Sequence, residues 1–205
     1  MRVVAGVYGG RRLRAPRGRQ TRPTSDRVRE ALFSTLGAHV AGAHVVDLYA
    51  GSGALGIEAL SRGAAGATFV ERDRATAAVL RANLRDLGLE EGSTAVPAVT
   101  VHVGDALRFV EAGPPAAAPR VDIVLCDPPY KIASDELATL LTRLAQRRWL
   151  SEDARLVAER TRHGEALTFP EQELHVADVR TYGDTVLYYI RRGPAGARRG
   201  GGGRA

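Results

Sequence analysis

Residues 45–56 join a short apolar run to a glycine-rich turn and to the first residues of an expected helix. The run Val45–Tyr49 predicts a strand, and Gly51, Gly53 and Gly56 follow it with the spacing G-x-G-x-x-G. Because glycine has no Cβ, the backbone of such a turn can approach a ligand closely, and the N–H groups that open the next helix point toward it. A strand, a turn and a helix in this order are typical of an α/β protein that binds a ligand at the turn.

The rest of the chain alternates between expected strands and expected helices. Helices are expected at 54–62, 74–87, 106–110 and 134–147, and further strands at 67–70, 99–103, 121–126 and 155–159. Two last strands, at 174–180 and 185–191, are joined by the tight turn 182–184, so the final strand should run antiparallel. The sequence therefore predicts a Rossmann-like α/β fold with a seven-stranded mixed sheet and helices on both faces.

The chain divides into three expected parts. A basic N-terminal extension covers 1–37 and should contain a β-hairpin around Gly9-Gly10 and a helix that ends at Gly37. The α/β domain covers 38–192. A tail at 193–205, rich in Gly and Arg, cannot bury apolar surface and is expected to be disordered.

Positive charge is concentrated at the two ends of the chain. Residues 1–36 hold nine Arg against two acidic residues, and 191–205 hold five Arg and no acid, although the formal net charge of the whole chain is only +6. A generally arginine-rich composition would not place the surplus at the ends. The pattern therefore indicates a polyanionic partner, with nucleic acid the leading candidate.

Several classes of protein are disfavoured by the sequence. The single cysteine, Cys126, excludes an internal disulfide framework and a multi-cysteine zinc site, and the five histidines are scattered. No apolar stretch approaches the ~20 residues of a membrane span, and the first residues of the sequence lack the long apolar run of a secretory signal. We therefore expect a cytoplasmic protein without metal or membrane contact, with Cys126 buried in a strand.

Acidic side chains lie at the ends of the first three expected strands. Asp47 lies near the end of the first, and Glu71 and Asp105 follow the second and third. Glu71 stands twenty residues after Gly51, where a carboxylate that accepts hydrogen bonds from ribose hydroxyls is expected, although a solvated strand-end acid would look the same. Asp105 either accepts from an adenine amino group or caps the next helix. Since ligands of open α/β sheets bind beyond the carboxyl ends of the strands, these acids predict one nucleoside-binding crevice.

The fourth expected strand runs directly into Asp127-Pro128-Pro129-Tyr130. Two prolines fix φ and remove backbone donors, so the carbonyl groups of this turn point outward as acceptors. The turn thus offers a carboxylate, a carbonyl and an aromatic face together. An exocyclic amine on a nucleobase has two N–H donors on a flat ring and matches this set. These four residues are the expected catalytic turn.

These features together resemble a known family. The glycine turn, Glu71, Asp105 and the Asp-Pro-Pro-Tyr turn resemble class I S-adenosylmethionine-dependent methyltransferases that act on amino groups. The segments Tyr-Gly-Gly-Arg-Arg-Leu at 8–13 and Arg-Pro-Thr-Ser-Asp-Arg-Val-Arg-Glu-Ala-Leu-Phe at 22–33 resemble the RsmD family of bacterial 16S rRNA guanine-N2 methyltransferases. The similarity runs from about residue 2 to 191 and leaves out the tail.

The resemblance implies transfer of a methyl group from S-adenosylmethionine to a guanine N2 amine in 16S rRNA, either naked or in the assembled 30S subunit. The residues that would hold the cofactor are Asp47, Tyr49, Gly51, Ser52, Gly53, Gly56, Glu71, Arg72, Asp105 and Ala106. Asp127 and the Pro128 carbonyl would accept from the amine, and Tyr130 would stack on the base. The arginines expected to contact RNA are Arg11, Arg12, Arg22, Arg27 and Arg29, and a monomer is expected.

Three other functions share part of this pattern. The first is a DNA adenine-N6 methyltransferase, because the Asp-Pro-Pro-Tyr turn also suits the amine of adenine. Such an enzyme would normally need a target-recognition region, for which the chain has little spare length. An NAD-dependent dehydrogenase accounts for the glycine turn and Glu71 and leaves the Pro-Pro turn and the basic ends unexplained. A non-catalytic RNA-binding module is disfavoured because Asp127 and the glycines are intact.

Overall fold

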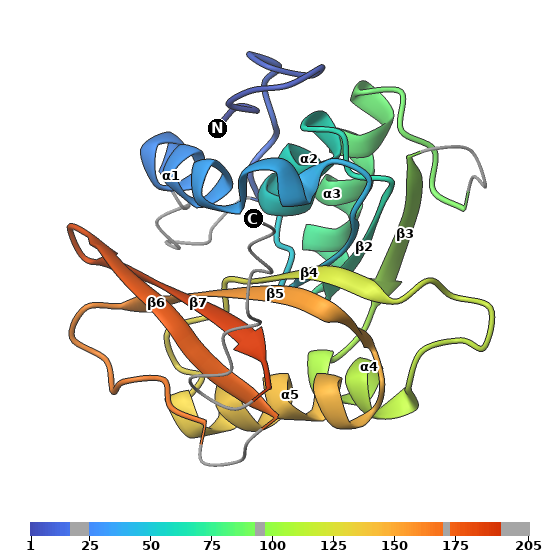
Figure 1. Cartoon of the computed structure of the whole chain (residues 1–205). Coiled ribbons are helices and arrows are strands. Elements are labelled where there is room, and N and C mark those ends of the chain that lie inside the picture. Colours follow the sequence, from blue (N-terminus) through green and yellow to red (C-terminus); the bar gives the residue numbers. More distant parts are fainter. Residues whose placement is uncertain (17–24, 93–96, 170–172, 194–205) are drawn as a thin grey trace, which may run out of the picture.

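The computed structural model describes residues 1–16, 25–92, 97–169 and 173–193, in which a seven-stranded sheet lies between two layers of helices (Figure 1). The strands are β1 (His44–Leu48), β2 (Gly66–Glu71), β3 (Ala98–Val103), β4 (Val121–Cys126), β5 (Leu150–Thr161), β6 (Leu174–Tyr182) and β7 (Thr185–Arg192). They lie in the order β3-β2-β1-β4-β5-β7-β6. Strands β1 to β5 pair in parallel, and β7 runs antiparallel to both of its neighbours, β5 and β6. The predicted mixed sheet is thus confirmed.

Helices cover both faces of the sheet, as predicted. They are α1 (Asp26–Leu36), the 3-10 helix η1 (Gly37–Val40), α2 (Ala54–Ser61), α3 (Arg74–Asp86), α4 (Ala106–Ala112) and α5 (Ser134–Gln146). Helices α1 to α3 bury Phe33, Ile57 and Leu80 on one face, and α4 and α5 bury Val110 and Leu141 on the other, beside Trp149. The strand order reverses between β1 and β4, so a crevice is expected at the carboxyl ends of these strands.

The N-terminal residues 1–16, here called the arm, differ from the expected pair of strands. One antiparallel bridge, Arg2 with Arg12, joins the two halves of the arm. The amides of Val4 and Ala5 donate instead to the Glu58 carboxylate, at 2.6 and 3.0 Å, because this fully buried acid of α2 needs donors. The arm therefore packs on α2, at the top of the molecule in Figure 1.

Strand β5 begins earlier and ends later than the predicted 155–159. Its pairing with β4 is irregular between Val121 and Ile123, and this accommodates the polar residues Glu152 and Asp153 that hide the strand in the sequence. Beyond Ala158, the partner of Cys126, the strand continues past the end of β4 to Thr161. Cys126 is buried, as predicted. Within the described ranges, the helices are too short or too polar to cross a bilayer.

Candidate functional site

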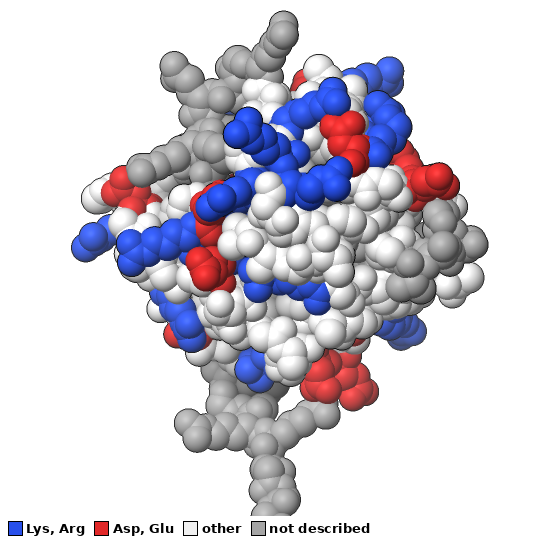
Figure 2. Space-filling model, turned by 90° about the horizontal axis from the view of Figure 1, so that it is seen from above, with Lys and Arg blue, Asp and Glu red and all other residues white. Residues whose placement is uncertain are grey.

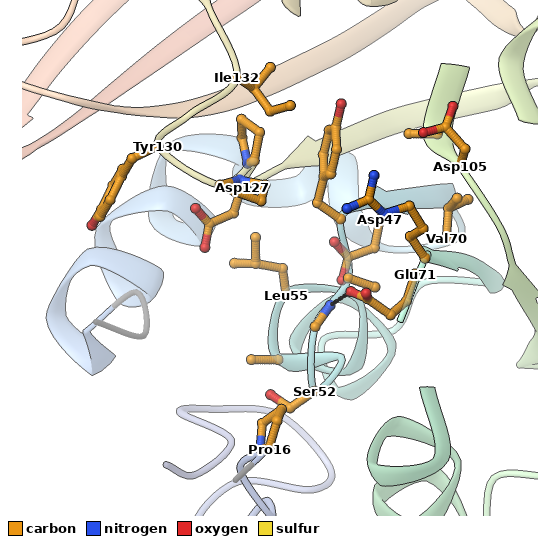
Figure 3. Close-up of a pocket in the computed structure, with 18 of the residues that line it drawn as sticks. Pro16, Asp47, Ser52, Leu55, Val70, Glu71, Asp105, Asp127, Tyr130 and Ile132 are labelled. Carbon is orange, nitrogen blue, oxygen red and sulfur yellow. Dashed lines mark hydrogen bonds between the residues drawn. The ribbon is translucent and has the colours of Figure 1, made fainter. Parts of the chain in front are cut away.

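A cavity of about 420 Å³ opens at the carboxyl ends of β1, β2, β3 and β4 (Figure 3). Its volume lies in the range of pockets that take small molecules or cofactors. The residues predicted from the sequence that line it are Asp47, Tyr49, Gly51, Ser52, Glu71, Arg72, Asp105, Ala106, Asp127, Pro128, Pro129 and Tyr130. Segments from four strand ends are thus brought together at one place, as expected for a parallel sheet.

The turn after β1 has a backbone that favours glycine. Gly51 and Gly53 have φ of 58° and 86°, and Tyr49 adopts φ of 61° although it carries a side chain. Gly53 N–H donates to the Ala50 carbonyl at 2.8 Å and closes the turn. Tyr49 therefore stores backbone strain at the cavity wall, as residues at functional sites often do.

Gly53 and Gly56 are placed differently from the expectation that they contact the cofactor. Neither is among the described residues that line the cavity. A Cβ at Gly53 would lie 2.2 Å from Leu80 Cδ1, and one at Gly56 would lie 2.3 Å from Phe69 Cε1. Both glycines therefore allow α2 to pack closely against α3 and β2, and they shape the turn from behind.

Replacing Gly53 with alanine is expected to destabilise the fold by about 2–4 kcal/mol, since overpacking at Leu80 adds to the strain of a positive φ. The matched control is Gly42→Ala, which has φ of 75° and a Cβ position with nothing within 4 Å among the described residues. Urea unfolding of both variants separates the cost of overpacking, which only Gly53→Ala has, from the cost of backbone strain, which both variants share. Equal losses of unfolding free energy would show that strain alone requires glycine at position 53.

Asp47 lies at the buried end of the cavity, with 1% of its surface exposed. Its Oδ2 accepts a hydrogen bond from Gly56 N–H at 2.8 Å, so it fixes the start of α2. Burial raises the pKa of Asp47 to about 8, and the nearby charges of Asp127 and Glu71 act in the same direction. At neutral pH this carboxyl is therefore mostly protonated, and a cationic ligand would favour its ionised form.

Glu71 joins the ends of β1 and β2. One carboxylate oxygen accepts from Gly51 N–H at 3.0 Å and the other from Asp73 N–H at 2.8 Å, and the residue is 4% exposed. The solvated strand-end acid considered for Glu71 is therefore excluded. Asp105 caps α4, because its Oδ1 accepts from Leu107 N–H at 3.0 Å and Arg108 N–H at 3.2 Å. It also lines the cavity, so the helix cap and a ligand contact are compatible.

The Asp-Pro-Pro-Tyr turn forms the side of the cavity opposite Glu71 and Asp105. Figure 3 shows the Asp127 carboxylate beside the Tyr130 ring, above Leu55. Tyr130 lines the cavity and is 60% exposed, so much of its side chain is accessible to a ligand. A carboxylate next to an exposed aromatic ring can hold a flat ligand that carries N–H donors.

The comparisons with known proteins agree with this geometry. Residues 1–191 match the family model described as "Conserved hypothetical protein 95". Ribosomal RNA small subunit methyltransferase D of Escherichia coli (strain K12) is 38% identical over 160 residues, which cover 78% of this chain and 74% of the relative. YlbH of Bacillus subtilis (strain 168) is 39% identical over 196 residues, which cover 94% of this chain and 100% of the relative. The solved structure of yhhF from Escherichia coli has a TM-score of 0.78 at 31% identity and covers 94% of this chain and 98% of that one.

The chain belongs to the RsmD family. Its sheet, with β7 inserted antiparallel between β5 and β6, is the class I methyltransferase fold. The family match includes the arm, and the structure shows a role for it that the sequence did not reveal: Met1, Ala15 and Pro16 line the cavity. In the described parts of this RsmD-family chain, no group of three or more His, Cys, Asp or Glu is arranged to hold a metal ion.

The arm is held against the glycine turn by one buried side chain. Asn83 of α3 is 1% exposed, accepts from Arg14 N–H at 2.8 Å and donates to the Arg14 carbonyl at 3.1 Å. The same amide donates to the Ser52 carbonyl at 2.9 Å. Sequence reasoning missed Asn83, because a polar residue in a helix carries no signal for partners in two distant segments.

The arginines expected to contact RNA fall into three groups in this RsmD-family structure. Arg11, Arg12 and Arg27 are exposed. Arg22 lies outside the described residues. Arg29 was expected to contact RNA, but it is only 1% exposed. Its guanidinium donates to the Arg2 carbonyl at 2.6 Å and to Asp26 at 2.8 Å. Arg29 therefore fastens α1 to the arm.

Proposed function

We propose that this protein transfers a methyl group from S-adenosylmethionine to the exocyclic N2 amine of a guanine in 16S rRNA. The observation that carries the proposal is the position of Asp127 and Tyr130 at the open side of a cavity whose inner side holds the glycine turn and Glu71. Such a site accommodates a cofactor within and a nucleobase at the mouth. The name of the Escherichia coli relative supports ribosomal RNA of the small subunit as the substrate.

The charge of the cavity favours S-adenosylmethionine over a nicotinamide dinucleotide. Among its described lining residues, five carry carboxyl groups, and two, Arg72 and Lys131, have cationic side chains. Because the carboxyl of Asp47 is mostly protonated in the free protein, it adds a negative charge only when a cationic ligand favours its ionised form. The sulfonium and ammonium groups of S-adenosylmethionine outnumber its carboxylate, whereas the pyrophosphate of a dinucleotide is anionic and would be repelled. The cavity also lies at the strand ends where an adenosine group would be expected.

Three contacts to the cofactor follow from this arrangement. Asp47 and the backbone of Gly51 and Ser52 would hold the methionine part, and Glu71 would accept hydrogen bonds from the ribose hydroxyls. Asp105 uses Oδ1 to cap α4 and would accept from the adenine amine with its other oxygen. When bound, the cofactor supplies an electrophilic methyl group.

The Asp-Pro-Pro-Tyr turn would prepare the target amine. The lone pair of guanine N2 is delocalised into the ring, so this nitrogen is a poor nucleophile. Asp127 and the Pro128 carbonyl would accept hydrogen bonds from its two N–H groups, which returns electron density to nitrogen and strengthens these contacts in the transition state. As the C–N bond forms, the bond between the methyl group and sulfur would break, and the nitrogen would release one proton to Asp127 or to water. Tyr130 would hold the base by stacking, and the base would have to be unpaired or flipped out of its helix.

The exposed arginines of the arm and of α1 would bind the RNA backbone. Figure 2 views the molecule from the side of the arm and shows many Lys and Arg side chains gathered on the upper part of that face. Arg11 and Arg12 of the arm and Arg27 of α1 are exposed, and Ala15 and Pro16 of the same arm line the cavity. Contacts of this kind orient RNA without reading its sequence. We expect the protein to act as a monomer in the cytoplasm.

Affinity for S-adenosylmethionine is expected to rise with pH up to about 8. Burial raises the pKa of Asp47 in the free protein, and a bound cation lowers that pKa, so binding releases a proton in the pH range between the lowered pKa and about 8. The dissociation constant should therefore fall by up to about tenfold per pH unit from pH 6 and become constant above 8. Calorimetric titration in two buffers of different ionisation enthalpy measures both the affinity and the released proton. If Asp47→Asn shows the same pH dependence as the wild type, Asp47 is not the group responsible.

Parallel methyl-transfer assays test the proposed function. Labelled S-adenosylmethionine is incubated with small ribosomal subunits that lack the modification, with naked 16S rRNA and with duplex DNA. Label in either RNA substrate supports the proposal, and the ratio between the two identifies the preferred form. Label that enters only DNA, as N6-methyladenine, would contradict the proposal and would indicate a DNA adenine-N6 methyltransferase instead.

A further inference from the structure

Arg160 is a buried cation beside the catalytic turn. It lies in β5, two residues beyond Ala158, which is the partner of Cys126 at the end of β4. Because β5 continues where β4 has ended, Arg160 stands next to the segment 127–133 that leads from β4 to α5. The residue is only 8% exposed.

The guanidinium of Arg160 holds the far end of this segment. Its Nη2 donates to the Ile132 carbonyl at 2.7 Å and approaches Ser134 Oγ at 3.4 Å. Ile132 N–H in turn donates to the Pro129 carbonyl at 2.9 Å, which closes the turn that presents Tyr130. Ser134 is itself fixed, since its hydroxyl donates to the Glu165 carbonyl at 2.8 Å.

Burying an arginine at this position lowers the stability of the fold more than burying an apolar residue would. Desolvation of a guanidinium costs several kcal/mol, so an apolar side chain would serve the core between the sheet and α5 at lower cost. The contacts of Arg160 are with the backbone and hydroxyl groups of a segment whose Pro129, Tyr130 and Ile132 all line the cavity. Its position therefore serves the geometry of the turn.

We infer that Arg160 is a positioning residue for methyl transfer: it fixes the Pro129–Ile132 turn so that Tyr130 and Asp127 meet the target base in one geometry. The inference rests on the proposed function. Misplacement of reacting groups by 1 Å can lower a rate by about 10²-fold while leaving a separate ligand site intact. Loss of Arg160 should therefore reduce turnover much more than cofactor affinity.

The test uses Arg160→Met, Arg160→Lys and the matched control Arg155→Met. Arg155 lies in the same strand, but its guanidinium contacts His39 of η1 at 2.6 Å, away from the turn. Lysine keeps the charge and one donor, so Arg160→Lys should recover part of any loss seen with methionine. It also keeps the test valid if Arg160→Met does not fold.

Proteolysis offers a direct measurement of the turn, because Lys131 is the only lysine of the chain. In wild type and in the two methionine variants, a lysine-specific protease can therefore cut only at Lys131–Ile132, beside the carbonyl that Arg160 holds. Arg160→Lys adds a second site at position 160, so for this variant the fragments cut at Lys131 are identified by mass. We expect Arg160→Met to be cut about tenfold faster than wild type or Arg155→Met. We also expect kcat to fall about 10²-fold with the dissociation constant of S-adenosylmethionine changed less than about twofold, and Arg160→Lys to lie between.

Two results would overturn the inference. The first is an unchanged cleavage rate at Lys131 in both Arg160 variants. The second is a parallel loss of kcat, cofactor affinity and melting temperature that Arg155→Met reproduces, since this would indicate general destabilisation. If the wild type transfers no methyl group but the Arg160 variants are still cut faster, the proposed function fails and the contact between Arg160 and the turn stands.

Discussion

Asp127→Ala is expected to lower methyl transfer by about 10²–10⁴-fold, because no carboxylate would then accept a proton or hydrogen bond from the target amine. Affinity for S-adenosylmethionine should change little, since Asp127 lies beside Tyr130, on the side of the cavity away from Glu71 and Asp105. Removing one negative charge should also lower the pKa of Asp47, because the charge of Asp127 helps to raise it. Single-turnover transfer with saturating cofactor measures the chemical step directly.

Two further variants make this prediction specific. Asp127→Asn keeps the shape and one acceptor but loses the charge, so it should retain more activity than alanine and much less than wild type. Asp135→Ala removes an exposed carboxylate in the first turn of α5 and should be close to wild type. Full activity of Asp127→Ala would remove this residue from the mechanism.

Glu71→Ala is expected to weaken S-adenosylmethionine binding by about 10²-fold, a change of about 2.7 kcal/mol. The substitution removes the expected ribose acceptor and also removes the carboxylate to which the Gly51 and Asp73 N–H groups donate in part-buried hydrogen bonds. Each lost hydrogen bond to a charged group is worth about 1.5–3 kcal/mol. Calorimetric or fluorescence titration of the purified variant gives the dissociation constant.

The control for Glu71 separates ligand binding from folding. Glu71→Gln keeps one carbonyl oxygen as an acceptor and replaces the other oxygen with an NH2 donor, so it should bind the cofactor better than alanine and less well than wild type. Glu90→Ala changes an exposed acid and should have no effect. A Glu71→Ala protein that binds the cofactor like wild type would place the ribose elsewhere in the cavity.

The cavity could be predicted from the sequence because its main residues follow parallel strands. Asp47, Glu71, Asp105 and Asp127 lie at or near the ends of four apolar runs, and the carboxyl ends of parallel strands meet at one edge of a sheet. The hairpin signal at 182–184 also led directly to the antiparallel β7. These predictions depend on local patterns, which the fold preserves.

The remaining features depend on contacts between distant segments. The arm reaches the cavity because Glu58 and Asn83 bind its backbone, and these partners lie 54 and 69 residues away along the chain. Charge pattern alone cannot distinguish Arg29, buried between α1 and the arm, from the exposed Arg27. Arg160 has no motif of its own, and its contact with Ile132 follows from the length of β5 beyond β4.

The most direct test of the proposed function is the chemical identity of the methylated nucleoside. Small ribosomal subunits from cells that lack this protein are treated with the purified protein and S-adenosylmethionine, and their 16S rRNA is digested and examined by mass spectrometry. N2-methylguanosine at a single position, absent after treatment with Asp127→Ala, is the predicted result. A different methylated nucleoside in an equally active reaction would contradict the assignment of the guanine amine to the Asp-Pro-Pro-Tyr turn.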